Sequence, residues 1–406
     1  MTIARLRSGA WFARRPVRVL CATLALVYVI AIATFAGTSD GLVDYQGRPL
    51  GTDFVSFWSA ARLALDGAPE AAYDPARHAA AQRHAIGRDE LPYYAWLYPP
   101  VFLLVVLPLA LLPYAWALAV WLAATLGAYL AVAARLVPDR LAIWLALAFP
   151  AAFVNLIHGQ NGFLTAALLG GALHLMRARP AASGVLIGVL AVKPQLGLLL
   201  PFALAAGRQW RAFAAAALTV LALAGASLLV FGRATWQAFA ASSGLGWDVA
   251  LVEGAAGFTK LQSTFAAVRL VGGPVWLGAV AQAAVTVTAA AVVVWLWRGR
   301  AAFELKAAAL PIAALLATPF VLDYDLVLLA PAIAFFAADG ARRGFLPWEI
   351  SALAGLWLLA PFARPLATAF DVPITALCLM GALALVVRRA RRLTPGLNPG
   401  VAADGA

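Results

Sequence analysis

A lysine inside an apolar run is the first residue whose position needs a chemical explanation. Lys193 stands in Lys193-Pro194-Gln195, with long apolar stretches on both sides. A charged side chain at the centre of a bilayer costs about 2.5–3.5 kcal/mol on insertion scales, so this ammonium needs a partner. Two partners fit: a phosphate, which a compact ammonium binds as a point charge, or an acid in a structural ion pair. Pro194 also frees backbone groups that must line protein or a wet cavity.

An acid at the start of a helical pattern is the second such residue. Asp53 precedes an apolar face at positions 54, 57, 58, 61 and 65, and these steps of three and four predict a helix that ends at Gly67. We expect this helix to lie in the outer membrane interface, with Phe54, Phe57 and Trp58 in the headgroup layer. Asp53 then has two possible roles: a helix N-cap, which contributes about 1 kcal/mol, or a carboxylate that meets a substrate from the bilayer.

Further polar side chains interrupt apolar runs later in the chain. His158 and Gln160, with an asparagine on either side of the pair, either form a polar turn or face a substrate. Asp323 and Asp325, at positions i and i+2, could bind a metal or sugar hydroxyls, or could form a solvated outer turn. Lys260 lies in a stretch of aromatic and polar residues that either binds a sugar or forms a plain outer loop.

The elements that must position these residues are membrane-spanning helices. Of the 406 residues, 64% are hydrophobic and only 12% are charged, which is too little charge for the surface of a soluble chain of this size. Many apolar runs have the length of about 17–25 residues that crosses a bilayer as a helix. We therefore predict an all-α fold, a single polytopic bundle over residues 1–406, with about twelve spans.

Charge predicts how this bundle is oriented. The net charge is +12, and the arginines gather at both termini and in short turns between spans, which is the positive-inside pattern. Both termini are therefore expected in the cytoplasm, including a tail over 389–406. The loops 38–98 and 232–273 are expected outside, and the first of them holds eight of the eighteen acids. We expect two short juxtamembrane helices in this first loop, the second over 76–87 behind a cap at Asp74.

One apolar run leaves two topologies open. Residues 181–207 form either one span that is broken at Lys193-Pro194 or two half-spans that meet at an outer turn. The positive-inside rule favours the second, because four flanking arginines then all lie inside. That choice requires an odd number of crossings within 99–136, which is awkward for so short a segment with Pro113 in its middle.

Several function classes have no signature in the chain. The distribution of the arginines argues against a nucleic-acid partner. Cys21 and Cys378 lie in predicted spans, so neither a disulfide framework nor a cysteine metal site has support. The sequence has no Walker glycine loop, no glycine-rich dinucleotide fingerprint and no HExxH motif. An enzyme with this sequence would take its activated substrate from a lipid rather than from a nucleotide.

An ordered set of motifs resembles a known family. The set comprises Asp53-Phe54 with Phe57-Trp58, Gly67-Ala68-Pro69, Tyr73-Asp74, Tyr98-Pro99-Pro100, Leu112-Pro113-Tyr114, Gly159-Gln160-Asn161, Lys193-Pro194-Gln195, Lys260-Leu261-Gln262-Ser263, and Pro319 with Tyr324-Asp325. In this order the motifs resemble the membrane glycosyltransferases of the GT-C fold. They are most similar to glycosyltransferase family 87, the polyprenyl-phosphate-mannose-dependent mannosyltransferases.

The resemblance implies an inverting transfer of a sugar, mannose by the family name, from a polyprenyl phosphate to a hydroxyl. The reaction would take place on the outer face of a bacterial plasma membrane. The resemblance implies Asp53 as general base, and Lys193, with His158 and Gln160, as the groups that bind the donor phosphate. We assign substrate binding to five further residues: Trp58, Gln195, Lys260, Asp323 and Asp325. The expected partners are the lipid-linked donor, a glycolipid or polysaccharide acceptor, and membrane lipids.

No cofactor is expected, and metal use is left open. Several GT-C enzymes carry two adjacent acids in the first outer loop. Here Thr52 and Phe54 flank the single acid Asp53, so the two-acid arrangement is absent.

Two other functions use the same lipid carriers. A transporter or flippase of a polyprenyl-linked sugar is one alternative, although the chain shows no internal repeat of the kind found in inverted-repeat transporters. An O-antigen polymerase or ligase is the other, but those enzymes usually display an arginine-rich outer loop, whereas loop 38–98 is acid-rich.

Overall fold

The computed structural model describes residues 2–254 and 257–393, and this part of the chain is helical, without strands. The all-α class is therefore confirmed. The α-helices are α1 Ile3–Ser8, α2 Arg14–Gly37, α3 Phe54–Leu65, α4 Pro75–Ile86, α5 Pro100–Val106, α6 Tyr114–Leu136, α7 Arg140–Leu147, α8 Pro150–His158, α9 Gly162–Leu175, α10 Pro180–Val189, α11 Leu200–Ala206, α12 Trp210–Trp247, α13 Thr264–Leu270, α14 Val275–Arg298, α15 Phe303–Leu316, α16 Leu329–Arg343, α17 Glu349–Trp357, α18 Leu359–Phe370 and α19 Ile374–Leu393. Short stretches of tighter or wider helix are η1 Pro69–Tyr73, η2 Leu107–Leu111, η3 Leu190–Val192, η4 Pro194–Gly197, η5 Asp248–Val252 and η6 Asp323–Leu328.

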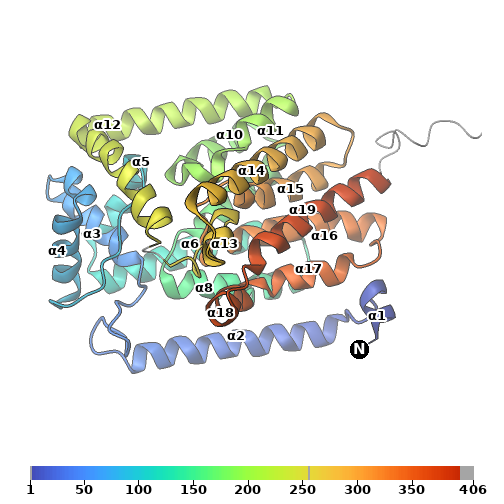
Figure 1. Ribbon diagram of the computed structural model, residues 1–406, viewed down its shortest axis with the longest axis horizontal. Coiled ribbons are helices and arrows are strands. Elements are labelled where there is room, and N and C mark those ends of the chain that lie inside the picture. The colour runs from blue at the N-terminus through green and yellow to red at the C-terminus, as the bar shows by residue number, and fades with distance from the viewer. Residues whose placement is uncertain (1, 255–256, 394–406) are drawn as a thin grey trace, which may run out of the picture.

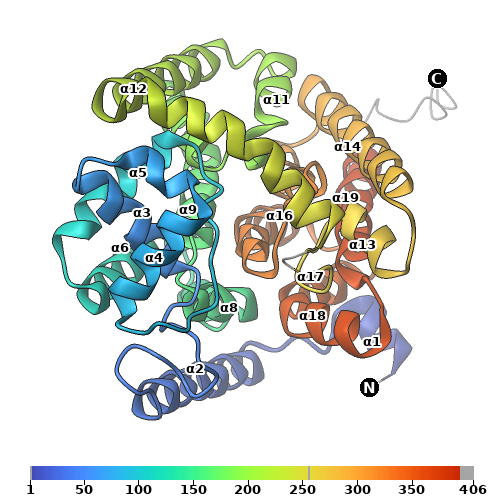
Figure 2. The same cartoon turned by 60° about the vertical axis from the view of Figure 1, so that its left-hand side comes forward.

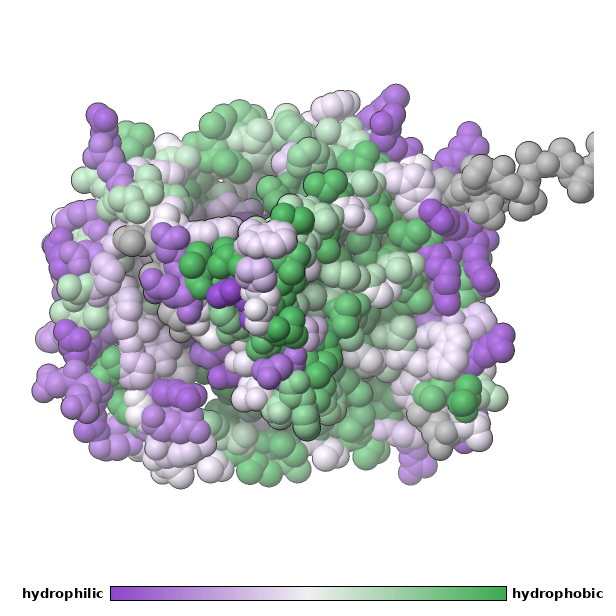
Figure 3. All heavy atoms as spheres, in the orientation of Figure 1, coloured by the Kyte–Doolittle hydropathy of each residue, from purple (hydrophilic) through white to green (hydrophobic). Residues whose placement is uncertain are grey.

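The bundle has two polar ends with an apolar band between them. One end, here the basic end, carries α1 and the C-terminal end of α19, and the other, here the loop end, carries α3 and α4 (Figure 1). Ion pairs join arginine-rich turns at the basic end: Arg14 Nη1 lies 2.7 Å from Asp139 Oδ2, and Arg342 Nη2 lies 2.7 Å from Glu304 Oε1. Hydrophilic residues gather at both ends and hydrophobic residues between them (Figure 3). This is the surface pattern of a protein that spans a membrane.

Fewer helices than the predicted twelve are long and apolar enough to span a membrane. Five helices are long and apolar enough to cross a membrane, and seven if two bent pairs each count as one span. These pairs are α7 with α8, bent by 50°, and α17 with α18, bent by 66°. The predicted count of about twelve spans is not confirmed, because several apolar runs fold as shorter helices that start at prolines, such as Pro100, Pro150 and Pro180.

The run 181–207 forms two half-spans, the second of the two predicted alternatives. A Cβ atom on Gly184 would lie 2.2 Å from the carbonyl oxygen of Ala212, and one on Gly188 would lie 2.8 Å from that of Ala216. A step of four residues along α10, from Gly184 to Gly188, therefore corresponds to a step of four residues along α12, from Ala212 to Ala216, so the two helices run in the same direction. After the end of α10 the chain must turn and run back to the start of α12, and Lys193 lies in this turn.

The segment 99–112 explains how this topology is possible. The Phe102 ring lies 5.1 Å from the Phe57 ring of α3, and the Trp58 indole N–H of the same helix donates a 3.0 Å hydrogen bond to the Leu112 carbonyl. Both ends of α5 and η2 therefore contact α3 and stay at the loop end. Only α6 then runs to the basic end, which gives 99–136 the odd number of traverses.

The aromatic side chains of α3 form part of a protein core. Phe54 and Phe57 are 0% and 1% exposed and pack against Trp96, Phe102 and Trp121. The prediction that α3 lies in the headgroup layer with these aromatics is wrong for both phenylalanines. Trp96 of the same loop, Phe102 of α5 and Trp121 of α6 supply the apolar surface against these rings, in place of lipid.

Much of the second predicted outer segment, 232–273, is helical where the structure describes it: the end of α12, η5 and α13 cover 233–252 and 264–270. Gly232 has φ +77 and breaks α12 where that segment begins. Residues 233–247 then cross the loop end toward α13 (Figure 2). The Phe239 ring lies 5.8 Å from the Tyr73 ring. Both long segments therefore meet at the same end of the molecule.

Helix α4 is fixed to α3 by its cap and by a buried histidine. Asp74 Oδ1 accepts hydrogen bonds from the backbone N–H groups of Ala76 and Arg77, at 2.9 and 3.1 Å, as the capping pattern predicted. His78 is fully buried, and its Nε2 lies 3.1 Å from the Ser56 carbonyl oxygen. Burial lowers the pKa of His78 to about 4, so the ring is neutral and Nε2 donates this hydrogen bond.

We expect the thermal stability of the protein to fall as the pH decreases from 6.5 to about 4. In this window the unfolded chain binds a proton at His78 and the folded chain does not, so protons favour unfolding. The expected loss is on the order of 3 kcal/mol. Melting temperatures of the wild type and His78→Gln between pH 4 and 7 test it, with the exposed His84→Gln as control. A profile for His78→Gln as steep as that of the wild type would contradict it.

Candidate active site

Asp53 lies at the loop end, directly before α3, and its carboxylate does not cap that helix. The residue has the N-cap position but makes no side-chain capping hydrogen bond. Instead, Asp53 Oδ2 accepts a 3.0 Å hydrogen bond from Nε2 of Gln160. The side chain is only half-buried. The carboxylate is therefore oriented by another element and remains open to a ligand.

The corner between α8 and α9 approaches α3 closely because it contains a glycine. Gly159 has φ +59, and a Cβ atom there would lie 2.6 Å from the Phe54 Cβ and 2.9 Å from the Gly51 carbonyl oxygen. The Trp121 indole N–H donates a 3.0 Å hydrogen bond to the Gly159 carbonyl and holds the corner. Any side chain at position 159 would push Gln160 away from Asp53.

Tyr98 fixes which way the Gln160 amide faces. Burial, and then the charges of Asp325 and Asp53, raise the pKa of Tyr98 well above its usual value, so its hydroxyl stays protonated. That hydroxyl donates to Gln160 Oε1 at 3.2 Å, and the Asn161 backbone N–H donates to the same oxygen at 3.1 Å. The amide oxygen is thus the acceptor of both, and the amide nitrogen is directed at Asp53.

Lys193 forms a buried ion pair. Its side chain is 3% exposed, and its Nζ lies 2.5 Å from Asp325 Oδ1 and 3.3 Å from Asn161 Oδ1. The ammonium also lies 5.1 Å from the centre of the Tyr324 ring. The other carboxylate oxygen of Asp325 accepts the Leu322 backbone N–H at 3.1 Å. The structural ion pair that the sequence left open as one alternative is therefore present.

The α8–α9 corner joins the acid to the lysine. Gln160 holds Asp53, and the next residue, Asn161, accepts from Lys193. The ring of His158, which precedes Gln160 by two residues, lies 6.1 Å from the Tyr324 ring. Its Nδ1 atom is buried without a hydrogen-bond partner in the part of the chain that the structure describes. A carboxylate and an ammonium thus share one polar corner within an apolar bundle.

A comparison with protein families decides the class of this site. The family model described as glycosyltransferase family 87 matches residues 96–322, more than half of the chain. The chain belongs to glycosyltransferase family 87. It is therefore a membrane glycosyltransferase of the GT-C type, and the resemblance drawn from the ordered motifs is confirmed. No curated protein and no solved structure matches the chain.

The region that matches the family model contains only some of the residues that form the site of the transferase. It includes the corner with Gln160 and the turn with Lys193. Asp53 precedes the matched region and Asp325 follows it. The fold brings both acids to residues of the matched region. Asp53 Oδ2 lies 3.0 Å from Gln160 Nε2, and Asp325 Oδ1 lies 2.5 Å from Lys193 Nζ.

The two acids of the 323–325 motif point to different partners. Asp325 faces Lys193, whereas Asp323 Oδ2 lies 3.9 Å from Arg364 Nη1. Within residues 2–254 and 257–393, three or more histidine, cysteine, aspartate or glutamate side chains do not converge into a group that could hold a metal ion. The interpretation of Asp323 and Asp325 as one joint binding pair is therefore not supported by their geometry.

The remaining predicted site residues, Trp58, Gln195 and Lys260, make no side-chain hydrogen bond or ion pair with the α8–α9 corner in the described ranges, although they lie on segments that neighbour it. Trp58 is half-exposed, and its indole N–H is taken by the Leu112 carbonyl. Gln195 is half-buried on η4, two residues after the lysine of the ion pair. Lys260 is half-buried and directly precedes Leu261, whose backbone pairs with that of Leu322. Lys260 and Arg364 therefore both lie on segments next to Asp323.

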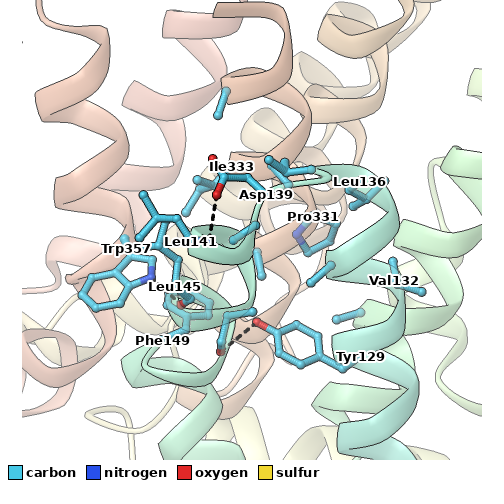
Figure 4. A pocket seen from close by; sticks show the side chains of 18 residues that line it. Tyr129, Val132, Leu136, Asp139, Leu141, Leu145, Phe149, Pro331, Ile333 and Trp357 are labelled. Carbon is cyan, nitrogen blue, oxygen red and sulfur yellow. Dashed lines mark hydrogen bonds between the residues drawn. The ribbon is translucent and has the colours of Figure 1, made fainter. Parts of the chain in front are cut away.

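A separate apolar cavity of about 170 Å³ lies toward the basic end (Figure 4). Its polar side chains are already engaged: the Tyr129 hydroxyl donates to the Ala146 carbonyl at 3.3 Å, and Asp139 Oδ1 accepts the Leu141 backbone N–H at 2.9 Å. A sugar site needs several polar groups directed at the ligand. This cavity is therefore not the place where the sugar is transferred.

Three residues of the site were not singled out from the sequence. Asn161 was visible as part of a polar interruption, but nothing indicated that it would contact Lys193. Tyr98 belonged to a family motif without an assigned role. Arg364 carried a usable signal, because it is an arginine inside the apolar helix α18 rather than at a terminus or a short turn.

Proposed function

We propose that this family 87 transferase moves a sugar from a polyprenyl-phosphate donor to a hydroxyl acceptor, with inversion at the anomeric carbon. The reaction takes place at the loop end, and mannose is the sugar that the resemblance implies. The observation that carries the proposal is the half-buried carboxylate of Asp53, oriented by Gln160. A carboxylate held in this way can accept the proton of an attacking hydroxyl as the oxygen bonds to the anomeric carbon.

Lys193 is the proposed partner of the departing phosphate. An ammonium has three N–H donors, and Asp325 and Asn161 supply acceptors for two of them. One donor is left for a phosphate oxygen, which must reach it through neighbours that now bury the side chain. Positive charge placed there stabilises the negative charge that grows on the phosphate in the transition state. Gln160, which was assigned to the phosphate from sequence, is better explained as the positioning residue of Asp53.

Charge supports an outward-facing reaction. The arginine-rich turns lie at the basic end, and positive residues are retained in the cytoplasm. The loop end then faces the exterior of a bacterial plasma membrane, where a lipid-linked donor and a glycolipid or polysaccharide acceptor can both reach Asp53.

The donor class is tested with purified protein in liposomes. Polyprenyl-phosphate mannose and nucleotide-activated mannose, both radiolabelled, are offered with an extract of membrane glycolipids and polysaccharide. We expect a labelled glycosidic product from the lipid-linked donor alone. Product from the nucleotide donor would overturn the proposal, as would movement of the labelled lipid across the bilayer without a new glycosidic bond, which is the result expected of a flippase.

The positioning role of Gln160 is tested by a double-mutant cycle. Replacing Gln160 by methionine removes the hydrogen bond to Asp53, and a base displaced by about 1 Å costs roughly 10²-fold in rate. Because Gln160 acts through Asp53, the same exchange should have little further effect on kcat in an Asp53→Asn background. Its effect on the melting temperature should persist in both backgrounds, since Tyr98 loses its acceptor in each. Losses in kcat that simply add would contradict the role.

A further inference from the structure

A groove between α14 and α19 combines an apolar floor with a basic end. Its volume is about 820 Å³, and it is lined by side chains of α14, α19 and the end of α15. Its apolar lining includes Val285, Val292 and Leu383. The single hydroxyl of the lining, on Thr288, donates to the Ala284 carbonyl of its own helix at 2.8 Å. The floor of the groove therefore offers hydrocarbon contact and no spare hydrogen-bond donor.

Three arginines continue one face of α19 at the end of this groove. Residues 380, 383, 384 and 387 line the groove in helical steps, and Arg388, Arg391 and Arg392 follow on the same face. Arg391 lies 5.7 Å from the centre of the Trp295 ring on α14. Arginine and tryptophan together are typical of the level where the lipid headgroups begin.

Arg391 and Arg392 differ from Arg388 and Arg389, whose charges are already matched by acids. Arg389 is fully buried and pairs with Asp339 at 2.6 Å and with Glu349 at 2.5 Å. Arg388 lies 3.7 Å from Glu349. Among the residues that the structure describes, the ion pairs at this end of α19 involve Arg388 and Arg389 but not Arg391 or Arg392. The groove therefore ends in positive charge that calls for an anion.

We propose that this groove binds one anionic phospholipid of the leaflet at the basic end. The phosphate would lie against Arg391 and Arg392, and an acyl chain would follow the apolar face toward Met380. Basic pockets between membrane helices on the cytoplasmic side bind anionic lipid headgroups in this manner. The groove lies at the end opposite to Asp53, so the lipid is a bound partner of the fold and not the sugar donor.

Native mass spectrometry of the detergent-purified protein tests this site. Phosphatidylglycerol and phosphatidylcholine with identical acyl chains are titrated into the wild type and the Arg391→Gln/Arg392→Gln variant. We expect one phosphatidylglycerol to bind the wild type in preference to phosphatidylcholine, and the variant to bind it about 30-fold more weakly, because each basic side chain near an anionic headgroup contributes about 1 kcal/mol. Equal affinities of wild type and variant would overturn the proposal.

Two further variants separate this site from general charge effects. Arg298→Gln/Arg300→Gln removes two exposed arginines from the same end but outside the groove, and should bind phosphatidylglycerol as the wild type does. Ala384→Phe fills the groove without a change in charge and should weaken binding. An equal loss in the Arg298 and Arg300 variant would show a diffuse charge effect and overturn the site. If Ala384→Phe fails to fold, the arginine variants decide. None of these measurements requires transfer activity, so they do not depend on the proposed reaction.

Discussion

Replacing Asp53 by asparagine is expected to lower kcat/KM by about 10²–10⁴-fold while the protein remains folded in the membrane. Asparagine cannot take up the proton of the acceptor hydroxyl. Its amide oxygen can still accept the hydrogen bond that Gln160 now donates to the carboxylate. The helix start also loses nothing, because Asp53 makes no capping hydrogen bond to α3. Rates of sugar transfer and melting temperatures, measured on the same preparations, test this expectation.

Asp66→Asn is the matched control for this exchange. Asp66 lies at the other end of α3 and pairs with Arg62 at 2.8 Å on the surface, where both side chains are about half exposed. An exposed pair of this kind contributes at most about 1 kcal/mol. We expect near-normal transfer by this variant. Near-normal transfer by Asp53→Asn would remove Asp53 from the mechanism, and equal losses in both variants would indicate a general effect of charge at the loop end.

Replacing Lys193 by methionine is expected to destabilise the protein by about 3–5 kcal/mol, because it leaves the Asp325 carboxylate buried without its partner. The double variant Lys193→Met/Asp325→Asn removes both charges and should recover much of this stability. If Lys193 binds the donor phosphate, the double variant should still show a raised KM for the lipid-linked donor and an unchanged KM for the acceptor. Melting temperatures and both KM values check these two expectations separately.

The surface pair provides the control for this experiment as well. Arg62→Met breaks an exposed ion pair with Asp66 and should cost at most about 1 kcal/mol. A Lys193→Met variant as stable as Arg62→Met would contradict the buried pair. A double variant that regains both stability and normal donor use would leave Lys193 with a structural role only.

The features of the fold that depend on neighbouring residues were predictable from sequence. The start of α3 after Asp53 and the cap of α4 at Asp74 follow from short patterns, and the structure shows both. The position of the arginines favoured the half-span topology of 181–207, but it did not decide between the two topologies, because the crossings of 99–136 could not be read from the sequence. The number of spans did not follow, because length alone does not show where an apolar run bends or stops.

The partners within the site were not predictable, because they are far apart in sequence. Gln160 and Asp53 are separated by 107 residues, and Lys193 and Asp325 by 132. A lysine in an apolar run indicates that its ammonium has an anionic partner, but a phosphate and a carboxylate can each fill that role. Phe54 and Phe57 illustrate the same limit, since an apolar helix face does not reveal whether lipid or protein covers it.

The anomeric configuration of the transferred sugar tests the central claim most directly. A single oriented base at Asp53 permits one displacement of the lipid phosphate, with the acceptor oxygen attacking from the opposite side. The wild-type product, made from a donor of known configuration and analysed by NMR, should therefore carry the inverted linkage. A product that retains the configuration of the donor would require either two successive displacements or attack on the face from which the phosphate departs, and would contradict the account of Asp53 given above.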